Sequence, residues 1–209
     1  MRNGLATITL IFVTVSVAAA QKVQTAEAIA AAGVCQGQEY RNSILGFSML
    51  APGGWSFYDA KQNQTAVERN KRLAAQAGDA KLQTSAANTQ ILFQAIPPAD
   101  RGQDKQAILS AGIERLTAPT TAEKYADVQK TLALASANVR VTKDVARVIY
   151  GGAAFFRYDV EGKTSRGSYR QRCLITLRKG IAFFIVATFF DDRQSAIVDS
   201  SLKSVKFNK

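Results

Sequence analysis

Side chains able to act as nucleophiles or proton carriers are scattered through this sequence and match no complete catalytic set. The 209 residues include no histidine, which excludes Ser/His/Asp and Cys/His catalysis, two-histidine zinc sites and haem bound through an axial histidine. Ser200 and Lys203 fit the pattern Ser-x-x-Lys, but the companion motifs Ser-Asp-Asn and Lys-Thr-Gly are missing. A non-catalytic role is therefore favoured. A hydrolase that uses carboxylates or this Ser/Lys pair in a cleft stays the alternative, because a carboxylate pair is defined by geometry rather than spacing.

Acidic residues occur in two groups that could offer oxygen ligands to a cation such as calcium. The first group is Asp100 and Asp104, and the second is Asp191, Asp192 and Asp199. Neither group has the spacing of an EF-hand loop. Asp191 and Asp192 precede an expected helix, where carboxylates cap free N–H groups and offset the helix dipole. We predict no metal ion and no cofactor.

The densest charge lies between Arg140 and Lys179, a window with ten basic and three acidic side chains and thus a net charge of +7. Four of its arginines are candidate partner-binding residues: Arg157, Arg170, Arg172 and Arg178. The expected strand pairing puts Arg170, Arg172 and Arg178 on one sheet face, and across the other hairpin Arg157 shares a face with Phe155 and Ala146. Guanidinium groups at the end of a partly apolar sheet face bind carboxylates or phosphates in bidentate fashion. The alternative is that they are solvated strand edges, whose charge discourages aggregation between sheets.

The first twenty residues have the pattern of a signal peptide. Arg2 precedes an uncharged apolar run, Leu5 to Val17, and Ala18 to Ala20 form a small-residue cleavage site. The run is shorter than the roughly 20 residues that cross a bilayer, so we expect no transmembrane segment in the mature chain. Residues 1–20 are predicted to be removed, which places the protein in the periplasm or outside the cell. There an acidic protein or an anionic envelope component is the expected partner, and nucleic acid is disfavoured.

Export also affects the interpretation of the two cysteines, Cys35 and Cys173. An oxidising compartment favours a disulfide between them, whereas in a cytosolic protein they would be buried thiols or part of a metal site. The pair is a candidate disulfide that would join the start of the mature chain to a strand.

The remaining sequence predicts one domain over residues 39–209, preceded by an alanine- and glutamine-rich flexible leader at residues 21–38. Strands are expected at residues 44–51, 89–96, 107–116, 145–150, 153–160, 168–177, 181–190 and 204–207. Helices are expected at residues 61–77, 120–135 and 192–202. Thr120 and Glu123 are predicted to form a capping box, and Gly151 and Gly152 a two-residue hairpin turn.

The segment from Ile181 to Phe190 decides the expected architecture. Both of its alternating residue sets are apolar, so this strand must be central and covered on both faces. Only the three expected helices can supply the cover, which indicates an antiparallel or mixed sheet between helical layers.

The order of elements resembles that of PsbP-like domains. The residues that carry the resemblance are Ile44, Leu45, Gly46, Phe47, Pro52, Gly54, Trp55, Gly151, Gly152, Phe155, Arg157, Gly180, Ile181, Leu202, Ser204 and Phe207. The group is similar across PsbP subunits of photosynthetic membranes and exported bacterial relatives such as DcrB. The resemblance implies an α+β fold, an α/β/α sandwich with a mostly antiparallel central sheet, used mainly to bind other proteins. It implies no site residues, because the matching positions are glycine, proline and core positions.

Overall fold

A computed structural model describes residues 25–58, 60–78, 80–98, 105–116, 118–135, 138–164, 167–178 and 180–208. The expected signal peptide at residues 1–20 lies outside the described residues, as do Asp100, Asp104 and Lys179. Within the described part of the chain, no helix is both long enough and apolar enough to cross a membrane.

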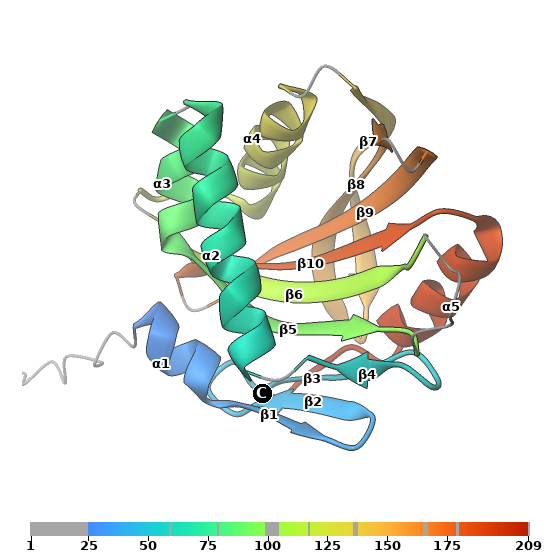
Figure 1. Ribbon diagram of the computed structural model, residues 1–209. Helices are drawn as coiled ribbons and strands as arrows, with labels where there is room; N and C mark the ends of the chain where they lie inside the picture. The colour runs from blue at the N-terminus through green and yellow to red at the C-terminus, as the bar shows by residue number, and fades with distance from the viewer. Residues whose placement is uncertain are drawn as a thin grey trace, which may run out of the picture.

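A seven-stranded antiparallel sheet forms the centre of the fold (Figure 1). In spatial order its strands are β4 (Ser56–Phe57), β5 (Thr89–Ile96), β6 (Ile108–Arg115), β10 (Ile181–Phe189), β9 (Gly167–Arg178), β8 (Ala153–Thr164) and β7 (Val139–Tyr150). The doubly apolar strand β10 is the middle strand, as its sequence predicts.

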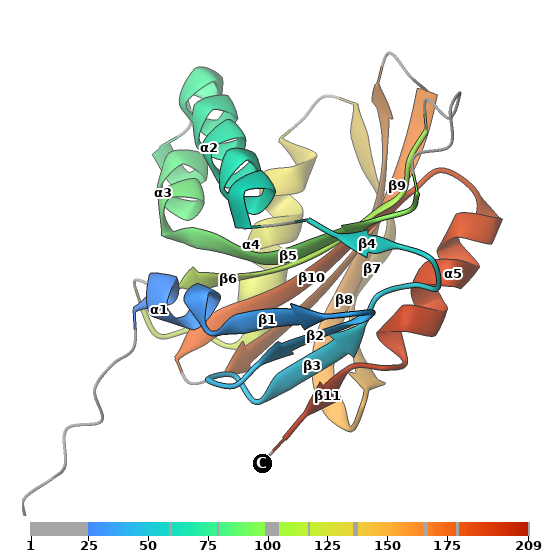
Figure 2. The same ribbon diagram turned by 60° about the horizontal axis from the view of Figure 1, so that its bottom comes forward.

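Helices and a second sheet cover the two faces of this sheet (Figure 2). The helices are α1 (Ala26–Ala31), α2 (Ala60–Ala77), α3 (Ala80–Asn88), α4 (Ala122–Leu134) and α5 (Asp192–Leu202). The small second sheet has the order β1 (Gly33–Gln36), β2 (Glu39–Asn42), β3 (Phe47–Leu50) and β11 (Lys206–Phe207). Helices α2, α3 and α4 lie over one face, and α1, α5 and the second sheet lie over the other. The expected α+β sandwich is confirmed, with a small sheet sharing one of its outer layers.

Two hydrophobic cores follow from this layering. The larger core lies towards the second sheet and is centred on aromatic rings, with the Phe47 and Phe183 centroids 4.7 Å apart. The smaller core lies beneath α4 and includes Tyr125, Tyr158 and Ile175. Burial of these side chains is the main stabilising contribution, at about 1.5–3 kcal/mol for each large apolar group.

The hairpin turn between β7 and β8 confirms the expected glycine pair. Gly151 and Gly152 have φ angles of 53° and 76°, the left-handed conformation that a type I′ turn requires at both positions. Gly151 is also closely covered, because an added Cβ would fall 1.5 Å from the carbonyl oxygen of Val205.

The amino-terminal segment differs from the expected flexible leader. Residues 26–36 form α1 and β1, and Ile29 is only 4% exposed in the larger core. A helix of this length needs only Ala26 and Ile29, three positions apart, to bury its inner side. The alanine-rich composition hides so short a pattern.

Helix starts were predicted with mixed success. The expected capping box at Thr120 is wrong by one residue, since the Thr121 hydroxyl accepts the Lys124 N–H at 3.2 Å and caps α4. Asp191 caps α5 as expected, accepting the Gln194 N–H at 2.7 Å.

Candidate functional site

The candidate arginines lie on one face of the large sheet, as the hairpin register predicts for Arg170, Arg172 and Arg178. Arg170 pairs with Phe189, Arg172 with Ala187 and Arg178 with Ile181 across β9 and β10. Arg157 lies on β8, next to this strand pair. Arg157, Arg170 and Arg172 come together near the start of β9, whereas Arg178 lies at its far end.

Arg157 and Arg172 are turned inwards onto one carboxylate. Arg157 donates two hydrogen bonds to the Asp159 carboxylate, and the Nε–Oδ1 distance is 2.7 Å. Arg172 approaches the same carboxylate from β9, with its Nε 3.7 Å from Oδ2. The three side chains are only 15%, 8% and 15% exposed for Arg157, Arg172 and Asp159. The hydrogen bonds to Asp159 raise the pKa of Arg157, which is charged at any physiological pH.

Two further ion pairs connect Arg172 and Arg170 to α5. Arg172 binds Asp199 on that helix, and Arg170 binds Asp192 with an Nη2–Oδ1 distance of 2.8 Å. Both guanidinium groups also stack over the Phe189 ring, at 5.1 and 5.5 Å from its centroid. The arginines therefore attach α5 to the sheet, a role that leaves Arg157 and Arg172 neutralised inside the protein.

Exposed cations surround Arg170 at this end of the sheet. We call Lys105, Lys163, Arg170 and Arg193 the basic end. Lys163 stands at the β8–β9 hairpin tip opposite Ser168, and the Lys105 ammonium lies beside Gly167 at the same tip. The Lys105 carbonyl accepts a hydrogen bond from Gln194 at the start of α5, next to Arg193.

In the described part of the chain, fewer carboxylates neutralise the cations of the basic end than neutralise Arg157 and Arg172. Lys105, Lys163 and Arg193 are exposed, and none has an ion-pair partner among the described residues. Arg193 stands in the first turn of α5, where a cation opposes the helix dipole and gives no local stability. The sequence indicated the region and Arg170, but Lys105 and Arg193 lie outside its basic window and are joined to it only by the fold.

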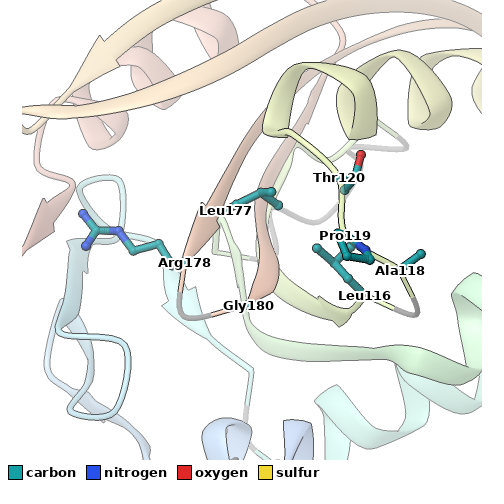
Figure 3. A pocket seen from close by; sticks show the side chains of 7 residues that line it. All are labelled: Leu116, Ala118, Pro119, Thr120, Leu177, Arg178 and Gly180. Atoms are coloured by element: carbon teal, nitrogen blue, oxygen red, sulfur yellow. The ribbon is translucent and has the colours of Figure 1, made fainter.

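Arg178 belongs to a different surface. Its guanidinium lies 3.9 Å from the centroid of the Phe207 ring. Figure 3 shows this side chain extending away from a groove of about 520 Å³, towards which Leu177 points. The groove is lined by Leu116, Ala118, Pro119, Thr120, Leu177, Arg178 and Gly180. This surface is mainly apolar, so Arg178 does not extend the basic end.

The candidate disulfide between Cys35 and Cys173 is not formed. Both cysteines are free, with Cys35 exposed in the second sheet and Cys173 buried in the core beneath α4. The large sheet separates them, because Cys173 points to the face opposite Arg172. Burial raises the pKa of Cys173 to about 12, so its thiol stays protonated and is no nucleophile at neutral pH.

The residues proposed for catalysis or metal binding do not converge. Ser200 and Lys203 are exposed on and beside the last turn of α5. The acidic residues of α5 act as a cap and as ion-pair partners of Arg170 and Arg172. Within the described ranges, no group of three or more cysteine, aspartate or glutamate side chains could hold a metal ion.

Fold and surface together define an α+β sandwich with an antiparallel sheet and a cationic end. No protein-family model and no curated protein matches the chain. Similar solved structures include a crystal structure from Bacteroides thetaiotaomicron, the crystal structure of LpqN, described as involved in cell envelope biogenesis of Mycobacterium tuberculosis, and the solution structure of the cyanobacterial PsbP protein CyanoP from Synechocystis.

These likenesses concern the fold alone. The Bacteroides structure is 15% identical with a TM-score of 0.45, and the match covers 84% of this chain and 50% of that one. LpqN is 9% identical with a TM-score of 0.49, and the match covers 77% of this chain and 83% of that one. CyanoP is 16% identical with a TM-score of 0.49, and the match covers 84% of this chain and 98% of that one. The chain thus spans half the length of the Bacteroides structure.

Proposed function

We propose that this protein is an exported, non-catalytic accessory domain that docks an acidic partner protein through the basic end. The observation that supports the proposal is the position of three exposed cations, Lys105, Lys163 and Arg193, around Arg170. They come from three separate parts of the chain, so the fold itself gathers their charge. Exposed like charges repel one another, and an anionic partner relieves that repulsion.

Arg170 provides the geometric part of the proposed docking. Its partner Asp192 has a side chain that is 94% exposed, and such a surface ion pair contributes only about 0–1 kcal/mol. A carboxylate of the partner protein can replace or join Asp192 at the guanidinium, which donates hydrogen bonds to two oxygens at once. Phe189 beneath Arg170 holds the guanidinium plane for this contact.

Arg157 and Arg172 are proposed to act indirectly. Arg172 forms an ion pair with Asp199 of α5, and Arg157 donates hydrogen bonds to Asp159 on the sheet. Both residues therefore position Arg170 and Arg193 rather than touch the partner. Export, which places the protein where envelope proteins are its neighbours, rests on the signal-peptide pattern of residues 1–20.

A charge-matched pair of variants tests the proposal. Lys105, Lys163 and Arg193 are replaced by serine in one variant, and the exposed cations Lys61, Arg69 and Arg72 of α2 in the other. Both lose three charges, so a general effect of net charge weakens both equally. Binding to immobilised polyglutamate is measured by surface plasmon resonance from about 50 to 300 mM salt, a range over which exposed charges become screened.

The basic-end variant should bind at least about tenfold more weakly at low salt, with a flatter salt dependence, and the α2 variant should stay within about threefold of the wild type. Equal losses in both variants would refute docking at the basic end. Vesicles of phosphatidylglycerol serve as a second ligand. Retention by vesicles but not by polyglutamate would replace the acidic protein by a lipid surface as the partner.

A further inference from the structure

A small pocket beneath α4 has a different chemical character from the basic end. It has a volume of about 130 Å³ and lies on the opposite face of the large sheet. Its lining comes from α3, α4 and five strands: Ser85, Thr89, Glu114, Tyr125, Gln129, Tyr158, Cys173, Ile175, Phe184 and Val186. A cavity of about 150 Å³ holds benzene, so this pocket has room for about six non-hydrogen atoms.

Among the described residues of the lining, Glu114 is the single charged one, and hydrogen-bond donors gather on one of its oxygens. Oε2 accepts hydrogen bonds from Ser85 Oγ at 2.7 Å, from the Tyr125 hydroxyl at 2.5 Å and from Gln129 Nε2 at 3.5 Å. An ionised carboxylate accepts such bonds with about four lone pairs over two oxygens. Among the described residues, Oε1 accepts no side-chain hydrogen bond and no cation lies within ion-pair distance of Glu114.

The network keeps Tyr125 in its neutral form. Burial first, and then the hydrogen bond and charge of Glu114, raise the pKa of Tyr125 above its ordinary value. The phenol therefore remains a hydrogen-bond donor to the Glu114 carboxylate at neutral pH. Burial likewise raises the pKa of Cys173 to about 12, so its sulfur stays a protonated thiol at neutral pH.

The walls of the pocket suit a cation. Three aromatic residues, Tyr125, Tyr158 and Phe184, line it, and aromatic faces attract ammonium groups. Gly112 lets the Phe184 ring approach β6 closely, since an added Cβ would fall 2.4 Å from the ring. Ile175 and Val186 complete an apolar floor for a short alkyl chain. A carboxylate that has no ion-pair partner among the described residues, above such a floor, matches an amphipathic cation.

We propose that this pocket binds a small organic cation, a primary alkylammonium compound whose nitrogen donates to Glu114 Oε1 and whose chain lies against the aromatic walls. The site is independent of the proposed docking function, because it lies on the other face of the sheet and attracts the opposite charge. Failure of either proposal leaves the other unaffected.

Calorimetric titration with n-butylammonium and with butan-1-ol tests the site, since the two ligands have the same length and differ mainly in charge. The wild type should bind the ammonium compound at least about tenfold more tightly than the alcohol, because the carboxylate and the rings both select for charge. Glu114→Gln should reduce that preference to about threefold or less. Glu123→Gln, which neutralises an exposed carboxylate on the neighbouring helix α4, should leave the preference unchanged.

A second measurement needs no variant. In the NMR spectrum of the wild type, saturating butylammonium should shift the ring protons of Tyr125, Tyr158 and Phe184, and butan-1-ol at the same concentration should shift them much less. Absence of a saturable shift, or equal shifts with both ligands, would overturn the proposal. An unchanged preference in a folded Glu114→Gln variant would overturn it as well.

Discussion

Asp159 is the anion on which the buried arginines depend, and its removal gives the sharpest test of the structure. Its carboxylate is 15% exposed and receives Arg157 and Arg172, whose side chains are 15% and 8% exposed. The substitution D159N preserves the size of the side chain and leaves two buried cations to share Asp199, which is 41% exposed. Removing one partner of a buried ion pair costs about 3–5 kcal/mol.

The loss for D159N is expected at the lower end of that range. Arg172 retains Asp199, and that carboxylate is exposed enough to be partly hydrated. We therefore expect the free energy of unfolding to fall by about 3 kcal/mol. The matched control is D192N, which neutralises the 94% exposed partner of Arg170 and should cost about 0.5 kcal/mol or less.

Urea denaturation at pH 7, followed by circular dichroism, measures both variants against the wild type. The double variant R157M/D159L replaces the buried Arg157–Asp159 pair by apolar groups. It should recover at least half of the stability that D159N loses, because Arg157 is gone and Arg172 still pairs with Asp199. If the free energy of unfolding of D159N lies within about 1 kcal/mol of the wild-type value, the assignment of these arginines to an internal structural network is wrong. The assignment is also wrong if D192N costs as much stability as D159N.

Two other predictions concern the cysteines and the β7–β8 turn. Cys35 is exposed and should react with a thiol reagent in the folded protein, whereas buried Cys173 should react only after unfolding. If both cysteines stay unreactive until the unfolded protein is reduced, a disulfide joins them after all. Folding raises the pKa of Cys173 from 9.0 to about 12. The protonated thiol therefore stabilises the fold below pH 9, and this contribution is lost as the pH rises towards 12. The urea midpoint should fall over that pH range, and it should fall less in C173A than in the wild type. Gly151→Ala should lower the free energy of unfolding by at least about 2 kcal/mol, because of the positive φ and the clash with the Val205 carbonyl. Gly152→Ala, whose Cβ meets no atom within 4 Å, should lower it by about 1 kcal/mol. Equal losses in thermal or urea unfolding would contradict the close contact at Gly151.

The parts of the fold that could be predicted are those determined by neighbouring residues. The glycine pair at Gly151 and Gly152 sets the register of one hairpin, and the apolar residues on both sides of β10 require its central position. The shared face of Arg170 and Arg172 follows from the alternation of side chains along a strand. Helix α2 and its end at Gly78, with φ of 71°, follow from helix propensity and the preference for glycine after a helix.

The parts that could not be predicted depend on distant segments. Asp199 and Asp192 neutralise arginines of β9 only because α5 returns across the sheet. Two signals were nevertheless present in the sequence. Asp159 stands two positions after Arg157 and must share its strand face, and Cys173 directly follows Arg172 and must take the opposite one. Both spacings indicated an internal arginine–aspartate pair and a cysteine turned away from the arginine face.

The pairing of β11 with β3 affects the order in which the protein can fold. Lys206 and Phe207 pair with Ser48 and Phe47, and Phe207 packs its ring among Phe47, Phe155 and Phe183. The Ser201 hydroxyl also donates to the Leu50 carbonyl, 151 positions earlier in the sequence. A chain that emerges from its amino end, during synthesis or export, therefore has β3 unpaired on one edge and the aromatic core open until β11 arrives. A factor that shields exposed strands would be most useful to this protein during that interval, and cleavage just before Lys206 should reopen the core from the side of the second sheet.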